Sequence, residues 1–140
     1  MKNIFVIAIA VLALFSGSVG AQDSIDKKQI EFLISSVENL NGEKFIRNGS
    51  EYDGKEAAEH LRMKLQNAGG KVQTADDFIR LCASKSFLSG KPYMIRSSDG
   101  KTRKSEEYFR EKLKQYNSTI KLMRHTGYDK LGQIKEGKVI

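Results

Sequence analysis

The chain has 140 residues, and 24 lysines and arginines against 17 aspartates and glutamates give it a formal net charge of +7. Its length fits one domain with one hydrophobic core, and its single cysteine excludes an intramolecular disulfide. Residues 22–84 carry nine basic and eleven acidic side chains, a net charge of −2, whereas residues 85–140 carry fourteen and six, a net charge of +8. The second half is therefore expected to attract anionic partners. The alternative is that its charge only keeps the protein dispersed in solution.

The first 21 residues are typical of a cleavable export signal. Lys2 supplies a positive charge, and an unbroken apolar run follows over Ile4–Phe15. Val19 and Ala21 are the small residues expected before a cleavage site. A membrane-spanning helix needs about 20 apolar residues, so the run is too short to cross a bilayer. We expect a signal peptide over residues 1–21 and no transmembrane segment in the mature chain; an uncleaved N-terminal anchor is the alternative.

A helix and a short strand are expected next. Apolar residues recur at steps of three and four from Ile30 onward, which predicts a helix over about residues 24–40. The β-prone segment Phe45–Arg47 predicts a strand, which the turn dipeptide Asn48-Gly49 ends.

Two more helices follow. Asp53 is expected to cap a helix over about residues 54–67, which the glycine pair after it ends. Thr74 and the two aspartates behind it predict the start of a third helix, which should fray around Ser84–Ser86. Cys82 lies on the apolar face of this third helix, so we expect it to be buried rather than reactive.

The last part of the mature chain predicts strands and a long helix. Tyr93–Arg96 is a second β-prone segment, and Lys101–Lys104 either pairs back as a hairpin strand or lies in solvent. Ser105 is expected to cap the longest helix. Its apolar stripe runs from Phe109 to Met123, and the chain from His125 onward is expected to be a loose tail.

These elements predict an α+β, mainly helical fold with about four helices and a small two- or three-stranded sheet. A single globular domain is expected over residues 22–118. Residues 119–140 would be the helix end and a basic tail.

Two segments of the chain resemble each other. Phe45–Gly49 is followed by a helix that carries Glu-x-x-Arg-x-Lys-Leu, and Met94–Ser98 is followed by the same helical pattern. Neighbouring strands would place Arg47 and Arg96 near the turns, in a small cationic pocket suited to a carboxylate or phosphate. Short patterns of this kind also arise by chance.

The order of several motifs resembles the YfeK-like family, small exported proteins of Gram-negative bacteria whose function is uncharacterised. The resemblance covers about residues 25–115 and implies a periplasmic location, but no activity and no catalytic residue. The motifs that carry it are Phe45–Gly49, Ala57–Leu65, Thr74–Ile79, Ala83–Ser86 and Ser89–Tyr93.

No motif in the sequence establishes catalysis or metal binding. Glu56 and His60 share a helix face, but zinc needs at least three protein ligands, so no metal and no cofactor are expected. Ser86 with His60 could form a hydrolytic relay, although the nucleophile-elbow motif is missing. The aromatic residues of the last helix are needed for packing, and export also argues against nucleic acid as a partner.

The sequence therefore favours a non-enzymatic periplasmic protein that binds an anionic envelope ligand or a protein partner. A small serine-dependent hydrolase and a helix-mediated assembly protein, which would use the stripe from Phe109 to Met123, are the alternatives. The candidate binding residues are Arg47, Asn48, His60, Arg62, Ser86, Lys91 and Arg96.

Overall fold

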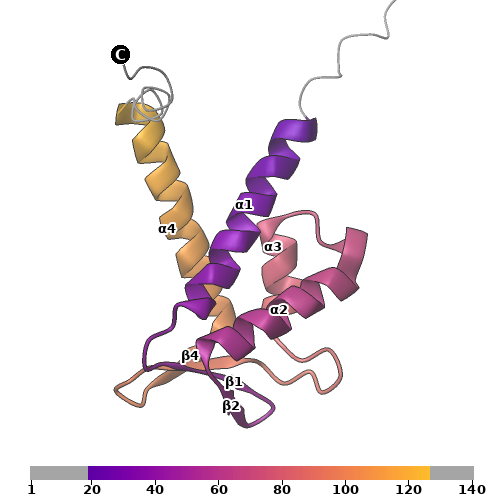
Figure 1. Cartoon of the computed structure of the whole chain (residues 1–140), viewed down its shortest axis with the longest axis vertical. Helices are drawn as coiled ribbons and strands as arrows, with labels where there is room; N and C mark the ends of the chain where they lie inside the picture. The colour runs from indigo at the N-terminus through magenta and orange to yellow at the C-terminus, as the bar shows by residue number, and fades with distance from the viewer. Residues whose placement is uncertain (1–18, 127–140) are drawn as a thin grey trace, which may run out of the picture.

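The structure is a computed structural model that describes residues 19–126, with side chains described from Asp23 onward. It is an α+β fold that is mainly helical, as the sequence predicts, with a small antiparallel sheet at one end of the helices (Figure 1). The expected signal peptide up to Ser18 and the tail from Gly127 lie outside the described residues. None of the helices in residues 19–126 has the length and apolar composition to span a membrane.

The sheet has the strand order β2-β1-β3-β4, and every neighbouring pair is antiparallel. Strand β1 (Lys44–Arg47) and strand β2 (Ser50–Tyr52) form a hairpin. Its turn residues Asn48 and Gly49 have φ angles of 50° and 83°. Two successive positive φ angles define the tight hairpin turn that Asn-Gly favours, so this dipeptide joins two strands rather than only ending one. Strand β2 was not expected from the sequence.

A second hairpin completes the sheet. Strand β3 (Met94–Arg96) pairs with strand β4 (Thr102–Lys104), which decides between the two expectations for Lys101–Lys104 in favour of the hairpin. Phe45 lies opposite Ile95 in the β1–β3 pair, and both side chains are buried. This face of the sheet packs toward the core, and the alternate residues face away from it.

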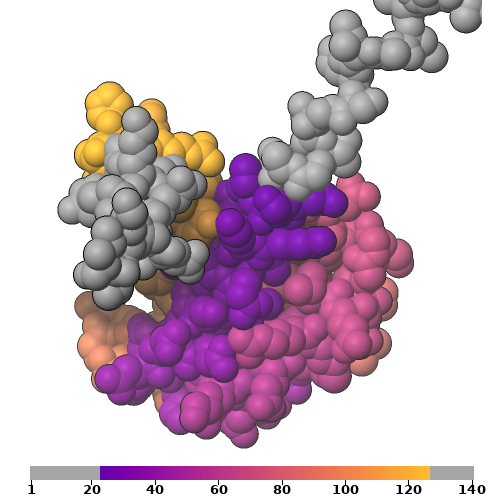
Figure 2. All heavy atoms as spheres, turned by 45° about the horizontal axis from the view of Figure 1, so that its top comes forward, coloured from indigo at the N-terminus to yellow at the C-terminus, as the bar shows by residue number. Residues whose placement is uncertain are grey.

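Helix α1 (Val19–Glu38) lies between α2 and α4 (Figure 2). It begins earlier than expected and passes through the expected cleavage position after Ala21. Its apolar side chains form the centre of the core with α2, the segment from Ala75 to Ala83 and α4. The largest fully buried aliphatic and aromatic residues are Leu33, Ile34, Val37, Phe45, Leu61, Phe78, Ile79, Tyr93, Ile95 and Phe109.

Helix α2 (Gly54–Ala68) begins as the sequence predicts. The Asp53 side chain accepts from the Glu56 amide at 2.9 Å, and the Glu56 carboxylate accepts from the Asp53 amide at 3.0 Å. This reciprocal capping box satisfies two of the free donors at the helix start. Gly54 lies against the end of α1, where a Cβ atom would come within 2.4 Å of the Val37 carbonyl oxygen. Only glycine allows this close approach. A 3-10 turn, η1 (Gly69–Lys71), follows α2.

The third helical segment starts at the expected cap. Thr74 and Asp77 form a second capping box at the start of α3 (Ala75–Phe78), which continues into a π-helical turn, η2 (Ile79–Ala83). Phe78, Ile79 and Cys82 are buried, as predicted. The Ser84 hydroxyl donates to the Ile79 carbonyl at 2.6 Å, which is the side-chain contact that ends the segment.

Helix α4 (Ser105–Thr126) differs from the expectation at both ends. Ser105 is buried and its hydroxyl donates to the Ala83 carbonyl at 2.6 Å, so it joins α4 to η2 instead of capping its own helix. His125 still belongs to the helix. Along the predicted stripe Phe109 is buried, whereas Met123 is 45% exposed, because α1 and α4 diverge toward that end (Figure 1).

Candidate anion-binding site

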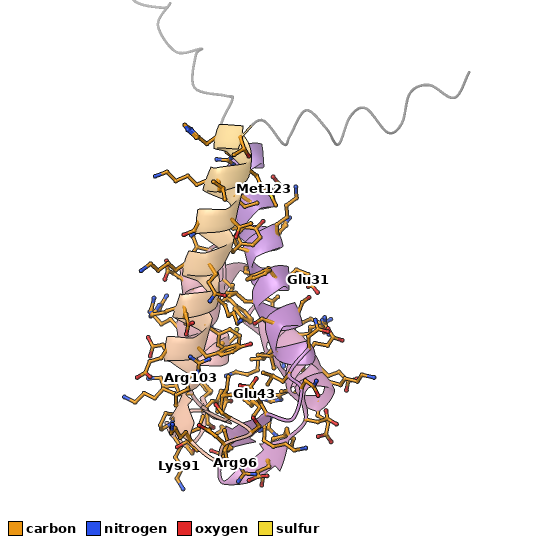
Figure 3. All side chains as sticks on the ribbon, turned by 90° about the vertical axis from the view of Figure 1, so that its left-hand side faces the viewer. Glu31, Glu43, Lys91, Arg96, Arg103 and Met123 are labelled. Atoms are coloured by element: carbon orange, nitrogen blue, oxygen red, sulfur yellow. The ribbon has the colours of Figure 1, made fainter. Side chains whose placement is uncertain are left out.

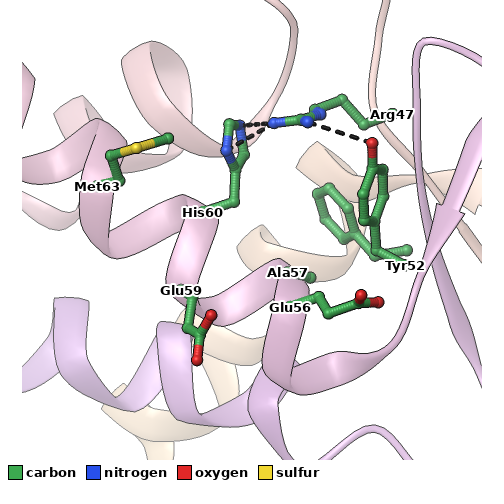
Figure 4. A pocket seen from close by; sticks show the side chains of 8 residues that line it. Arg47, Tyr52, Glu56, Ala57, Glu59, His60 and Met63 are labelled. Carbon is green, nitrogen blue, oxygen red and sulfur yellow. Dashed lines mark hydrogen bonds between the residues drawn. The ribbon is translucent and has the colours of Figure 1, made fainter.

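A pocket of about 300 Å³ lies where strands β1 and β2 meet the first turns of α2 (Figure 4). The antiparallel hairpin places Arg47 and Tyr52 on one wall, and the helix places His60 on the other. The residues that line the pocket are Phe45, Arg47, Tyr52, Glu56, Ala57, Glu59, His60 and Met63.

Arg47 reaches across the pocket to His60. It lies two positions after buried Phe45 on β1, so its side chain leaves the strand on the face that packs against α2. Its Nη1 lies 2.6 Å from Nδ1 and 2.5 Å from Nε2 of His60, and its Nη2 donates to the Tyr52 hydroxyl at 3.2 Å. Because a guanidinium is only a donor, a ring nitrogen of His60 that accepts from it must carry no proton, which favours the neutral imidazole.

The environment of His60 keeps it neutral. Burial lowers the pKa of His60, and the positive charges of Arg47 and Lys64 lower it further. A charged imidazole would be both partly desolvated and repelled by two cations. An anion placed in the pocket would oppose this effect, because its negative charge would favour the protonated imidazole.

Lys64 lies one helical turn beyond His60 on the same side of α2. Its ammonium donates to the Lys85 carbonyl at 2.9 Å and to the Tyr93 hydroxyl at 3.3 Å, and it lies 4.9 Å from the centre of the Tyr93 ring. The pKa of Lys64 is lowered, mainly by burial. The nearby Cys82 opposes this shift, and the positive charge of Arg47 adds to it. Burial also raises the pKa of both Cys82 and Tyr93, which keeps the thiol and the phenol neutral.

Arg47 has no carboxylate partner within residues 19–126. Glu56 also lines the pocket, but its carboxylate accepts from the backbone of Asp53. Glu59 points away from the Arg47–His60 contact in Figure 4. A partly buried guanidinium without an anion is a feature that ligand-binding sites use. The arginines that do form salt bridges with carboxylates in the described part of the chain are Arg62, Arg80, Arg96, Arg103 and Arg110.

Arg62 does not belong to the pocket. It lies on the α1 side of α2, where its guanidinium donates to Glu38 at 2.7 Å and to Glu31 at 3.1 Å. Its hydrogen bond to Glu38 raises the pKa of Arg62 and lowers the pKa of the Glu38 carboxyl. Arg62 therefore joins two helices and is already neutralised.

Arg96 does not share a pocket with Arg47, so the sequence-based expectation of a joint site is wrong. The two residues do lie on neighbouring strands, but β1 and β3 are antiparallel, and Arg96 pairs with Lys44 at the opposite end of β1. Arg96 is also on the other face of the sheet, where it forms a salt bridge with Glu51. A joint site at the ends of the two strands would need strands that run in the same direction, which the antiparallel pairing excludes.

Asn48, Ser86 and Lys91 lie in a second region next to the pocket. The Ser86 hydroxyl is buried and accepts from the amide of Ser89 at 3.3 Å. The Ser89 hydroxyl in turn donates to the Asn48 side chain at 2.7 Å and accepts from the amide of Lys91 at 3.3 Å. Within residues 19–126 Ser86 has no hydrogen bond to a histidine, so the hydrolytic relay with His60 is not assembled.

Three residues in or beside the pocket were not among the candidates from the sequence. Tyr52 lies on the unexpected strand β2, and Tyr93 is packed against His60, with ring centres 6.5 Å apart. Lys64 could have been found, because its spacing of four from His60 places both on one helix face. Among the described residues, no group of three or more His, Cys, Asp or Glu side chains could hold a metal ion.

Comparison with known proteins identifies the family. A model of a family of unknown function, DUF5329, matches residues 24–117. The chain belongs to this family. It is also 33% identical over 93 residues to the uncharacterised protein YfeK of Salmonella typhimurium, a match that spans 66% of this chain and 77% of that protein. The resemblance expected from the sequence is thus confirmed. No solved structure matches the chain significantly. The DUF5329 region contains the whole pocket, from β1 to α2.

Proposed function

We propose that this protein binds a small anionic ligand, without chemical change, in the pocket between Arg47 and His60. The observation that carries the proposal is the guanidinium of Arg47, which faces a neutral imidazole and a phenol instead of a carboxylate. The export signal expected over residues 1–21 would place this activity in the periplasm, where the ligand would be an envelope component.

Binding would replace weak partners of Arg47 by a strong one. A carboxylate or phosphate accepts two parallel hydrogen bonds from a guanidinium, and such charged pairs are about twice as strong as neutral ones. His60 would then gain a proton and become a second charged donor, and the Tyr52 hydroxyl would be released to bind the ligand. Lys64 would add positive charge from the next helical turn.

The size of the pocket limits the ligand. A volume of about 300 Å³ is at the lower end of small-molecule sites, so one anionic group and a few further atoms fill it. Phe45 and Met63 provide an apolar wall, which favours an anion that carries a short apolar part over a bare inorganic ion.

The proposal is tested by calorimetric titration with inorganic phosphate, sulfate and succinate. Arg47→Gln should weaken binding of the best of these anions about tenfold or more, because it removes a charge-assisted contact. Arg80→Gln is the matched control, since Arg80 is 64% exposed and, among the described residues, forms a salt bridge with Asp77 in the same helical segment. Equal binding by the two variants would show that net charge, and not the pocket, attracts the anions.

Assembly through the end of α4 is the second candidate function. Leu122 and Met123 are 62% and 45% exposed, and both lie where α4 diverges from α1. Two apolar side chains of this kind on a helix can pair with a second helix. A concentration-dependent mass measurement on the wild type and on a Leu122→Ser/Met123→Ser variant tests it, and a constant monomer mass in both would exclude it.

A further inference from the structure

Residues 84–93 form a narrow finger between η2 and β3, the salmon-coloured loop below α2 in Figure 1. Its two sides run antiparallel. The Tyr93 amide donates to the Ser84 carbonyl at 2.9 Å, Lys85 and Pro92 form a bridge, and the Ser86 amide donates to the Lys91 carbonyl at 3.0 Å. The finger therefore has a fixed base and a short tip.

The tip presents two apolar side chains to solvent. Phe87 is 91% exposed and Leu88 is 94% exposed, and they are adjacent in the chain. The other large exposed apolar side chains in the described part of the chain are less exposed than these two; Leu122, the next, is at 62%. Single exposed apolar residues are ordinary, but a fully exposed phenylalanine–leucine pair at a protruding tip indicates an interaction site.

Hydrogen bonds hold the tip in this exposed position. The Gly90 amide donates to the Ser86 carbonyl at 3.0 Å, and Gly90 has a φ angle of +68°, which suits glycine. Ser89 donates to Asn48 of the β1–β2 turn, and Lys64 of α2 holds the Lys85 carbonyl. The finger is thus fastened to two other elements, and its apolar tip is directed outward by its backbone.

The surroundings of the tip are basic. The chain has no aspartate or glutamate between Asp77 and Asp99. Lys85 and Lys91 are both exposed on either side of the tip. In Figure 3 Lys91 lies at the sheet end of the molecule, far from Met123 at the end of α4. An apolar tip between two lysines is complementary to an anionic membrane surface, in which negatively charged head groups cover an apolar layer.

We infer that the finger docks this protein onto a bilayer that contains anionic lipids. Phe87 and Leu88 enter the apolar layer, and Lys85 and Lys91 remain at the level of the head groups. A membrane fits the tip better than a protein partner does. A stable protein interface buries about 800 Å² on each side with complementary shape, which two side chains at the end of a finger do not supply. This inference is independent of the ligand proposed for the pocket.

The absence of tryptophan from the chain allows a local test. Phe87→Trp, in the full-length protein as recovered from the expressing cells, places one fluorescent side chain at the tip. On addition of phosphatidylglycerol-containing vesicles its emission should move to shorter wavelength, and lipids brominated on their acyl chains should quench it. Thr119→Trp, at an exposed position of α4 outside the Leu122 and Met123 pair, is the matched reporter, and its emission should stay unchanged.

The emission spectra also define the contrary results. No change at residue 87, or equal changes at residues 87 and 119, would overturn the docking through the finger. A change at residue 87 that requires an added protein and does not occur with vesicles would assign the tip to a protein partner and overturn the membrane docking.

Vesicle co-sedimentation separates the apolar and the charged contributions. Lys85→Gln/Lys91→Gln should weaken binding about tenfold or more, since each lysine near an anionic surface contributes about a fivefold effect. The control variant Lys104→Gln/Lys114→Gln removes the same charge outside the finger, and it should weaken vesicle binding much less. Phe87→Ser/Leu88→Ser should lose binding and keep its unfolding temperature, because both side chains are exposed. Undiminished binding by that variant would overturn the inference.

Discussion

Arg47 of β1 and His60 of α2 face each other across a pocket, with Nη1 of the arginine 2.6 Å from Nδ1 of the histidine. The contact joins a permanent cation to an imidazole that burial keeps neutral. This pairing leaves the positive charge of the arginine uncompensated. In the proposed function an anion would pair with this guanidinium, and His60 would take up a proton.

Anion binding is expected to become tighter as the pH falls. The pKa of His60 is below the ordinary histidine value in the free protein, and a bound anion would raise it, so binding takes up a proton. Affinity then rises as the pH falls through the raised pKa of His60 in the complex toward its lowered pKa in the free protein. Sulfate is the suitable anion because it keeps its charge across this range. Calorimetric titrations at several pH values measure the effect.

A histidine variant supplies the control for this pH dependence. His60→Gln should bind sulfate with nearly constant affinity across the same range, whereas His125→Gln should behave as the wild type. A pH dependence that persists in His60→Gln would assign the proton to another group.

Gly54→Ala is expected to destabilise the fold by about 2 kcal/mol or more. A Cβ atom at this position would lie 2.4 Å from the Val37 carbonyl oxygen and 2.8 Å from that of Glu38, so α1 and α2 would have to separate. Gly70→Ala is the matched control, because a Cβ atom there meets nothing within 4 Å. Urea unfolding of both variants measures the difference. Similar midpoints would show that the two helices are not in this close contact.

Cys82 should be unreactive until the protein unfolds. Its side chain is 1% exposed, and burial raises the pKa of its thiol, so little thiolate is present and reagents cannot reach it. Labelling by a chromogenic disulfide reagent should be slow in buffer and fast in urea above the unfolding midpoint. Rapid labelling in buffer would mean that the segment from Ala75 to Ala83 opens easily.

The local signals in the sequence predicted the helices well, because caps and turns depend on neighbouring residues. Asp53 and Thr74 form the capping boxes that their positions indicate, and Asn48-Gly49 forms a tight turn. Strand β2 was missed, since Ser50 and Glu51 are exposed and carry no apolar alternation. Its strand character comes from pairing with β1.

The candidate site could be predicted only in part. The structure places His60 beside Arg47, whereas Arg62 and Arg96 each have a carboxylate partner on another element, which no local pattern reveals. The direction of β3 beside β1 is also a tertiary property, and it decides on which face and at which end Arg96 lies. The exposed tip at Phe87 and Leu88 likewise became apparent only from the finger around it.

The most direct test of the pocket follows the proton on His60 by nuclear magnetic resonance. The chain has two histidines, so the imidazole signals of His60 and His125 can be assigned with one variant, and His125 serves as an internal reference. We predict a pKa of His60 below the ordinary value without added anion, a rise on addition of sulfate, and no such rise in Arg47→Gln. A His60 pKa that sulfate leaves unchanged would contradict an anion site between Arg47 and His60.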